Sequence, residues 1–296
     1  MTGWRVRLWA LWQTSRPDQL LLILVVYLLG AKIAAAVGTS LDGRHVALGA
    51  LPLLTIAASV HYANEYADYE TDARTQRTPF SGGSGALQRA NLPRSLALHA
   101  AVASLCLGVL LVTVLAATGW LTLSPVALLG IIAVFGWQYS VPPLQLAWRG
   151  WGEVDNSLLG GLVLPVYGAA VVEGPLATVA LAVIPFFLVV LLNLFATQWP
   201  DRAADASVGK DTLAVQWSPT RLRRSYAAIG CLAGVSLLAL WGSVLPTAVV
   251  LASLPVAPLV VWGALGYTNR ATPWPTVLAM VGLAVLQFAS WCWVAA

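Results

Sequence analysis

The chain has 296 residues, of which 59% are hydrophobic and only 9% are Asp, Glu, Lys or Arg. A soluble domain carries about 25% charged residues, so this composition excludes a chain that covers itself with a water-exposed surface. The formal net charge of +4 is typical of basic loops beside a membrane and does not indicate a nucleic-acid partner. We therefore expect an all-α integral membrane protein that forms a single domain over residues 1–296.

Apolar runs recur from one end of the chain to the other. Each is about 18–25 residues long, which is the length that a helix needs to cross a bilayer. The runs lack the two-residue alternation of a barrel strand, so helices are the expected spanning elements. They predict nine transmembrane helices in one bundle, over residues 18–37, 46–67, 95–118, 121–140, 154–172, 175–199, 221–241, 245–266 and 273–295.

The positive charges predict the orientation of this bundle. Nine spans place the two termini on opposite sides of the membrane, and 14 of the 16 Lys and Arg residues then fall on the side of the N-terminus. Only Lys32 and Arg44 fall on the other side. Because basic loops remain in the cytoplasm, we expect a multi-pass protein of the plasma membrane with a cytoplasmic N-terminus and an external C-terminus. The three long polar loops, 68–94, 145–153 and 200–224, are then all cytoplasmic.

The second predicted span ends in the sequence HYANEYADYETD. Asn64, Asp68 and Asp72 are four residues apart, so they stack on one helical face at intervals of about 6 Å. Glu65 and Glu70 are expected to point away from this ridge. Like charges at this spacing destabilise a helix unless a cation neutralises them, and a charged helix end in water is the alternative interpretation.

A second acidic motif follows the sixth predicted span. Asp201 and Asp205 are again four residues apart, in FATQWPDRAADASVGKDTLAV. Two such pairs at cytoplasmic helix ends favour function over a solvated helix end, because they form facing clusters of hard oxygen ligands. Mg²⁺ takes one or two carboxylates per ion and completes its octahedron with water and phosphate oxygens. The pattern predicts a site where Mg²⁺ binds a diphosphate.

Basic groups follow both acidic motifs. Arg74 and Arg77 come after the first motif and Lys210 comes after the second. Guanidinium forks match the geometry of phosphate groups, and lysine supplies a point charge. The Gly/Ser-rich segment RTPFSGGSG, residues 77–85, fits a phosphate-binding loop or a lid equally as well as a flexible connector.

Together, Asn-x-x-x-Asp-x-x-x-Asp on the second span, Asp-x-x-x-Asp after the sixth and the nine spans resemble the UbiA-type intramembrane prenyltransferases over the whole chain. The resemblance implies a bundle with an intramembrane cavity open to the cytoplasmic side. It also implies a polyprenyl diphosphate donor, an aromatic acceptor and bound Mg²⁺, with no obligate protein partner. The metal ligands implied are Asn64, Asp68, Asp72, Asp201 and Asp205.

Two further segments carry the resemblance to the donor site. RTPFSG is similar to the family's Arg-Pro-x-Pro-Ser-Gly segment and implies Arg77 as a diphosphate contact, with Arg74 beside it. GKDTLAV is similar to Gly-Lys-x-Thr-Leu and implies Lys210. One position departs from the pattern, because many members have Asn where this chain has Thr197. Asn193, one turn earlier, is the candidate substitute.

The stretch YSVPPLQLAWRGWGEV, residues 139–154, resembles the corresponding loop of the menaquinone-pathway branch, which prenylates 1,4-dihydroxy-2-naphthoate. An ordinary Pro/Gly-rich turn is the alternative. Branches that use 4-hydroxybenzoate, homogentisate, a chlorophyll precursor or glyceryl phosphate remain open.

Two residues near this loop are candidates for catalysis. Tyr139 would stabilise a developing cation with its ring face, and Glu153 would act as the base. For Glu153 the alternative is a structural ion pair with Arg149, four residues earlier. For His61, an interhelical hydrogen bond is a better interpretation than a catalytic role.

Three other classes of protein fit the sequence less well. A secondary transporter also has polar groups within its spans, but its sites usually lie near the midplane and its ligand leaves unchanged. A CDP-alcohol phosphatidyltransferase has a denser acidic motif than this chain contains. A purely structural membrane protein leaves both acidic motifs unexplained.

Overall fold

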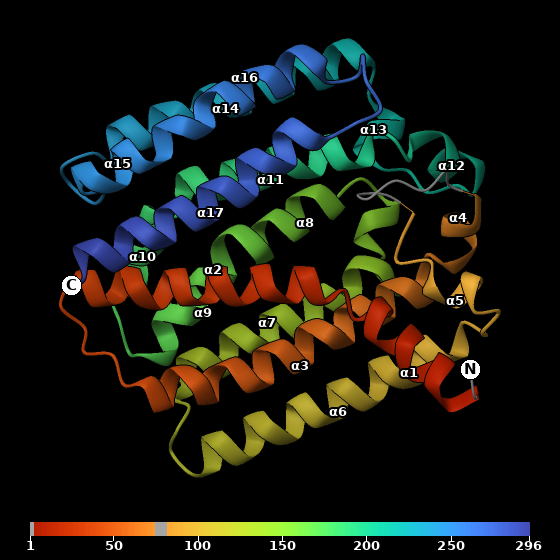
Figure 1. Cartoon of the computed structure of the whole chain (residues 1–296), viewed down its shortest axis with the longest axis horizontal. Coiled ribbons are helices and arrows are strands. Elements are labelled where there is room, and N and C mark those ends of the chain that lie inside the picture. The colour runs from red at the N-terminus through yellow and green to blue at the C-terminus, as the bar shows by residue number, and fades with distance from the viewer. Residues whose placement is uncertain (1–2, 75–81) are drawn as a thin grey trace.

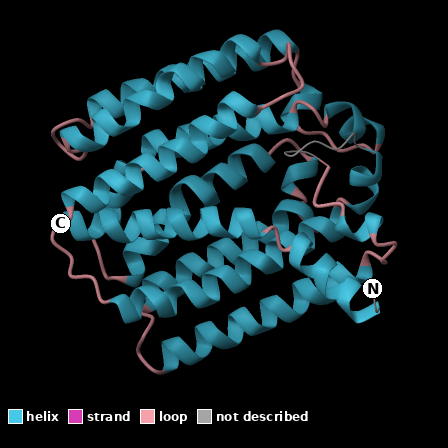
Figure 2. Cartoon of the chain, viewed as in Figure 1, coloured by secondary structure: helices cyan, strands magenta, loops and turns pink. Residues whose placement is uncertain are grey.

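The computed structural model describes residues 3–74 and 82–296, and its regular elements are helices. Figure 2 shows them as long, roughly antiparallel rods joined by loops. The longer continuous helices are α1 (Gly3–Thr14), α2 (Pro17–Ala36), α3 (Gly43–Ala67), α6 (Ser95–Ala117), α7 (Leu123–Ser140), α11 (Ile184–Gln198), α14 (Pro219–Ala239), α16 (Ala257–Gly266) and α17 (Trp274–Val294).

Short helices complete the spans and the loops. The fifth predicted span is built from α8 (Gly152–Leu158), a π-helical turn at Leu159–Val163 and α9 (Leu164–Val171). The sixth is α10 (Leu176–Ala182) followed by α11, and the eighth is α15 (Thr247–Ser253) joined to α16 by a 3₁₀ turn. The polar loops hold α4 (Tyr69–Arg74), α5 (Ala86–Arg89), the 3₁₀ turn Leu146–Trp148, α12 (Arg202–Ser207) and α13 (Leu213–Gln216).

Within the described residues, seven helical segments are long and apolar enough to cross a membrane, and an eighth is the α10–α11 pair, bent by 52°. Pro185 lies in the first turn of α11, just after this bend. The multi-pass character predicted from the apolar runs is therefore confirmed. The seventh predicted span, 221–241, corresponds to α14. This helix carries Arg221, Arg223 and Arg224 near its start and is not among the apolar segments.

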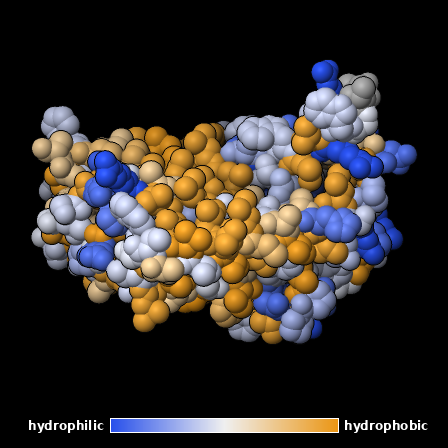
Figure 3. Space-filling view, turned by 90° about the horizontal axis from the view of Figure 1, so that it is seen from below, coloured by the Kyte–Doolittle hydropathy of each residue, from blue (hydrophilic) through white to orange (hydrophobic). Residues whose placement is uncertain are grey.

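The bundle has polar groups at its two ends and apolar side chains along its middle, as Figure 3 shows for one face. The N-terminus and the C-terminus lie at opposite ends of the bundle (Figure 1). The loop helices α4, α5, α12 and α13 gather at the same end as the N-terminus. We call this end the loop end.

Close helix packing in the middle depends on small residues. A Cβ at Gly30 of α2 would overlap the backbone carbonyl of Pro165 in α9, and one at Gly168 of α9 would overlap the carbonyl of Tyr27. Small residues let membrane helices approach this closely, where van der Waals contact drives association. The backbones of α2 and α9 therefore lie in direct contact at these two glycines.

Candidate active site

The first acidic motif lies where α3 ends and α4 begins. Asp68 closes α3, and the helical path continues because its N–H donates to Asn64 and its carbonyl accepts from the N–H of Asp72 at 2.8 Å. The spacing of Asn64, Asp68 and Asp72 therefore produces the predicted ridge. The Asn64 amide nitrogen donates to Asp68 Oδ2 at 3.0 Å and to Ser140 Oγ at 2.8 Å.

The second acidic motif lies between α11 and α12. Asp201 caps α12, and its carbonyl oxygen accepts from the N–H of Asp205 at 2.9 Å. The Asp205 side chain is buried, and α12 contacts α4 of the first motif. Residues that are 133 positions apart in the sequence, Asp68 and Asp201, thus belong to adjoining helix ends.

Lys210 joins the two motifs. Its Nζ lies 3.2 Å from Asp68 Oδ1 and 3.7 Å from Asp205 Oδ1. Burial alone would lower the pKa of the Lys210 ammonium, but the two carboxylates outweigh it and the pKa is raised. Lys210 is consequently a permanent positive charge between the two acidic motifs.

The same cluster disfavours negative charge on the carboxylates. Burial, together with the charges of Asp68 and Glu65, raises the pKa of Asp72 to about 7. Burial raises the pKa of Asp205 to about 6, although Lys210 opposes this. An additional cation beside these carboxylates would lower their pKa and stabilise their charged forms.

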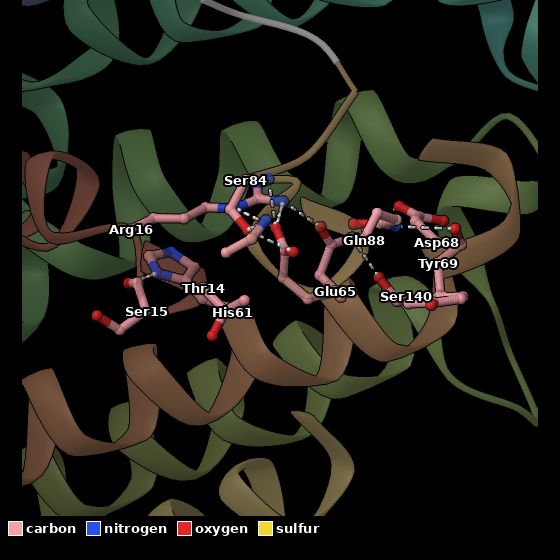
Figure 4. Close-up of polar contacts among 12 residues, drawn as sticks. Thr14, Ser15, Arg16, His61, Glu65, Asp68, Tyr69, Ser84, Gln88 and Ser140 are labelled. Carbon is pink, nitrogen blue, oxygen red and sulfur yellow. Dashed lines mark hydrogen bonds and ion pairs between the residues drawn. The ribbon is translucent and has the colours of Figure 1, made fainter. Parts of the chain in front are cut away.

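Arg16 and Glu65 form a partly buried ion pair beside the first motif, as Figure 4 shows. Arg16 Nη2 lies 2.7 Å from Glu65 Oε1 and also donates to Asn64 Oδ1 at 3.1 Å. The expectation that Glu65 points away from the ridge is wrong, because its side chain is 2% exposed and lies against this network. Glu70 does point outward, where it pairs with Arg94.

Glu65 also holds the end of the Gly/Ser-rich loop. Its two carboxylate oxygens accept hydrogen bonds from the Ser84 N–H and the Ser84 hydroxyl, each at 2.8 Å. Gly83 has φ +61°, and a Cβ there would collide with the Asp72 carboxylate. The backbone at Gly83 therefore passes directly over the acidic ridge.

Sequence reasoning missed Arg16, Glu65, Ser84 and Ser140. One available signal was Glu65 itself, because an acid next to an apolar run needs a partner when it is buried. Arg16 lies directly before the first predicted span, on the same predicted side of the membrane as Glu65.

The remaining donor-site candidates lie in different surroundings. Arg74 is exposed at the end of α4, and Arg77 lies outside the described residues. Thr197 donates its hydroxyl to the Asn193 carbonyl of its own helix at 2.9 Å. The Asn193 side-chain oxygen is buried without a hydrogen-bond partner. Of these two, Asn193 has the oxygen that is free to accept.

The catalytic candidates belong to α7, which carries Tyr139, and to α8, which carries Glu153. Glu153 is 1% exposed, and its Oε1 accepts from the Leu213 N–H at 2.8 Å. Its Oε2 is buried without a hydrogen-bond partner. A Cβ at Gly152 would lie 3.0 Å from the Tyr139 ring, so this ring packs against the start of α8.

Two alternatives from the sequence are resolved by these contacts. Arg149 donates to the Pro143 carbonyl at 3.2 Å, and no ion pair joins it to Glu153 within the described residues. His61 Nδ1 donates at 2.7 Å to the carbonyl of Ser15, which lies in the turn between α1 and α2. The hydrogen bond thus joins α3 to this turn and not to another helix.

The donor set fits a hard divalent cation that keeps few protein ligands. Among the described residues, no group of three or more acidic, His or Cys side chains forms a closed metal cage. Carboxylates of the two motifs nevertheless converge on one cation, Lys210. Such an arrangement suits Mg²⁺, which takes one or two carboxylates and leaves its other positions to water and phosphate. Asn64 offers its oxygen to Arg16, so a metal would have to compete for it.

Residues 23–283 match the family model described as the UbiA prenyltransferase family. A comparison with curated proteins found no match.

Solved structures share the fold at low sequence identity. A structure of a UbiA homologue from Archaeoglobus fulgidus bound to GPP and Mg²⁺ aligns with a TM-score of 0.66 at 16% identity, over 97% of this chain and 99% of that one. The apo structure of a UbiA homologue from Aeropyrum pernix K1 aligns at 0.71 and 14% identity, over 92% and 96%. A structure of digeranylgeranylglyceryl phosphate synthase aligns at 0.69 and 13% identity, over 96% and 98%.

Proposed function

Because the chain belongs to the UbiA prenyltransferase family, we propose that it transfers a polyprenyl group from an allylic isoprenyl diphosphate to an aromatic acceptor, 1,4-dihydroxy-2-naphthoate. One observation carries the proposal. Carboxylates from two distant acidic motifs, Asp68 and Asp205, meet at one lysine at the loop end of a membrane bundle. A site that binds only a cation would not need a lysine at its centre, whereas a diphosphate site does.

Asp68, Asp72, Asp201 and Asp205 are the residues proposed to hold Mg²⁺, with Asn64 or Asn193 as an amide ligand. When bound, the metal would neutralise the negative charge that develops on the leaving diphosphate. Lys210 contributes a fixed positive charge to the same group, and Arg74 and Arg77 are proposed to contact it from the loop side. These charges favour the transition state because they are already in position before the reaction.

The reaction begins with cleavage of the allylic C–O bond, and the electron pair leaves with the diphosphate. The Tyr139 ring is proposed to stabilise the resulting allylic cation through its π face. The acceptor ring attacks this cation and forms the new C–C bond. With dihydroxynaphthoate the carboxylate is then lost as CO₂, and with other acceptors a proton is lost.

For acceptors that lose a proton instead of CO₂, Glu153 is proposed as the base that receives this proton. Its Oε2 has no hydrogen-bond partner, while its Oε1 is held by the backbone of Leu213. One oxygen is thus fixed and the other is free to accept. Burial of this group among the spans also excludes water, which would otherwise quench the cation.

The acceptor is proposed from the resemblance of residues 139–154 to the menaquinone-pathway loop. Other acceptors remain candidates: 4-hydroxybenzoate, homogentisate, a chlorophyll precursor and glyceryl phosphate. The last is supported by the structural likeness to digeranylgeranylglyceryl phosphate synthase, a likeness of fold at 13% identity. A transporter is the non-enzyme alternative.

We also propose nine crossings of the plasma membrane with the loop end in the cytoplasm. The α10–α11 pair counts as one span and α14 as another, which adds two to the seven long apolar segments. The opposite positions of the two termini in Figure 1 agree with an odd number of crossings. The basic loops support a cytoplasmic loop end. Here the resemblance also implies an intramembrane cavity that opens to this side.

The test is a transfer assay on the purified chain in detergent. Geranylgeranyl diphosphate and Mg²⁺ are supplied with dihydroxynaphthoate, 4-hydroxybenzoate, homogentisate or glyceryl phosphate in separate reactions, and products are detected by mass spectrometry. A prenylated, decarboxylated naphthoquinol supports both the reaction and the acceptor. Product with another acceptor retains the mechanism and discards the naphthoate. Movement of an unchanged ligand across a liposome membrane, without any product, would favour the transporter.

A further inference from the structure

A pocket lies at the loop end, apart from the acidic motifs. It has a volume of about 280 Å³ and lies between α11, α16 and α17. Trp199 and Tyr267, whose ring centroids are 6.2 Å apart, form its wall toward the second acidic motif. No acidic side chain lines it within the part of the chain that the structure describes. The proposed transfer reaction therefore leaves this pocket without a role.

The pocket faces the lipid-contacting side of the bundle. Trp262 of α16 and Trp274 and Leu278 of α17 line it, and their side chains are 49%, 48% and 43% exposed. Both helices are among the segments able to cross a membrane. Large apolar side chains exposed on such helices contact lipid. Tryptophans near helix ends are typical of the headgroup level.

Arg270 gives the pocket its charge. It lies in the turn between α16 and α17 and is the charged residue among the described lining residues. No ion pair engages it in the described part of the chain. A basic pocket between membrane helices on a loop-bearing side is complementary to an anionic lipid headgroup.

Two glycines of α16 keep the pocket open. A Cβ at Gly263 would collide with the Tyr226 hydroxyl and lie 2.8 Å from Thr276 Oγ1. The close packing at the inner wall of the pocket therefore requires glycine at position 263. At Gly266, the nearest atom to a Cβ would be Arg270 Cδ at 3.8 Å. Position 266 therefore borders open space beside the arginine, and a larger side chain fits there without disturbing the wall.

We propose that this pocket binds one anionic phospholipid of the surrounding bilayer, with its headgroup on Arg270 and part of an acyl chain between Trp262 and Trp274. The charge of Arg270 selects the headgroup, and the exposed tryptophans accept the apolar part. This inference rests on the membrane location of the chain and is independent of the reaction that the acidic motifs catalyse.

The test is native mass spectrometry of the delipidated full chain, titrated with phosphatidylglycerol or with phosphatidylcholine of the same acyl chains. We expect one tightly retained phosphatidylglycerol, bound about fivefold more strongly than phosphatidylcholine. Both lipids carry a phosphate, but the choline cation cancels its charge, whereas the net negative charge of phosphatidylglycerol contributes about 1 kcal/mol per basic residue. Arg270→Gln should remove the preference, and Gly266→Leu should weaken the binding of both lipids. Arg224→Gln is the matched control, because Arg224 is an exposed arginine at the loop end that does not line the pocket, and it should retain the preference.

Size-exclusion profiles and melting temperatures establish that each variant is folded, so a loss of lipid is attributed to the pocket. Equal binding of the two lipids by the unaltered chain would overturn the proposal. So would an Arg270→Gln variant that keeps the preference. Displacement of phosphatidylglycerol by dihydroxynaphthoate would also contradict it and would assign the pocket to the aromatic carboxylate.

Discussion

The two acidic motifs have the same local geometry but different supports. In each, one backbone hydrogen bond joins the paired aspartates, at 2.8 Å for Asp68–Asp72 and 2.9 Å for Asp201–Asp205. The first motif is surrounded by polar groups from distant segments, including Arg16, Ser84 and Ser140. Asp205 has its cation nearby in the sequence, because it pairs with Lys210, five residues later in its own loop, whose N–H also donates to the Asp205 carbonyl. The same Lys210 reaches across to Asp68.

An identical sequence pattern can thus be positioned in two ways. Tertiary contacts hold the first motif, so its geometry depends on residues that no local pattern identifies. The second motif carries its cation within its own loop. We therefore expect substitutions around the first motif to affect both folding and activity, and substitutions around the second to affect mainly substrate binding.

The largest effect is expected from Asp68→Asn. Asp68 accepts from both Asn64 and Lys210, so loss of its charge disturbs both supports of the site. We expect kcat/KM for prenyl transfer to fall at least about 100-fold, as when one preorganised charge contact of a transition state is removed. Glu70→Gln, in the same segment but 71% exposed, is the control and should retain activity. Near-normal activity of Asp68→Asn would remove this residue from the site.

Glu65→Gln should cause the largest loss of stability. It leaves the partly buried Arg16 without its ionic partner, and because the Arg16 side chain is 21% exposed, we expect a loss of about 2 kcal/mol, between that of a buried pair and that of an exposed one. The matched change is again Glu70→Gln, which breaks the exposed pair with Arg94 and should cost less than about 1 kcal/mol. Thermal unfolding in detergent compares the two. Equal melting temperatures would mean that the Arg16–Glu65 pair does not support the first motif.

Lys210→Met should weaken donor binding by about tenfold, because a hydrogen bond to a charged group is lost. The measurement is the affinity for geranylgeranyl diphosphate in the presence of Mg²⁺. Lys32→Met, on α2 and away from the acidic motifs, is the control for general loss of positive charge. An unchanged affinity in the Lys210 variant would contradict its proposed role on the diphosphate.

The smallest effect is expected from Ser84→Ala. The variant loses the hydroxyl's bond to Glu65 and the bond that the hydroxyl oxygen accepts from the Ala86 N–H, but it keeps the backbone bond to Glu65. It should lose about 1 kcal/mol of stability. Ser207→Ala removes an exposed hydroxyl that bonds within its own helix, and its melting temperature should not change. If the two variants have the same melting temperature, the Ser84 hydroxyl does not contribute to stability.

The apolar runs predicted the helices well, because span length is set by bilayer thickness. The first predicted span, 18–37, is Pro17–Ala36 in the structure, and the ninth, 273–295, is Trp274–Val294. The bend before Pro185 and the π turn at Leu159–Val163 were not predicted. The average hydrophobicity of a long segment does not reveal where a helix bends or changes its hydrogen-bond pattern.

At the site, the spacing of Asn64, Asp68 and Asp72 predicted their ridge, since helical periodicity is a local property. The Arg16–Glu65 pair was not predictable in the same way. Its partners are 49 residues apart, and their contact depends on how α2 and α3 pack. The role of Arg77 in the diphosphate site stays a prediction, because that residue lies outside the described residues.

The most direct test of a shared diphosphate site is a double-mutant cycle on donor binding. The affinity for geranylgeranyl diphosphate with Mg²⁺ is measured for the unaltered chain, Asp68→Asn, Asp205→Asn and the double variant. If the two motifs form one site, the double variant should bind only slightly more weakly than Asp68→Asn, with a coupling energy of at least about 1 kcal/mol. Losses that simply add would mean that the motifs act independently, and would contradict a shared diphosphate site.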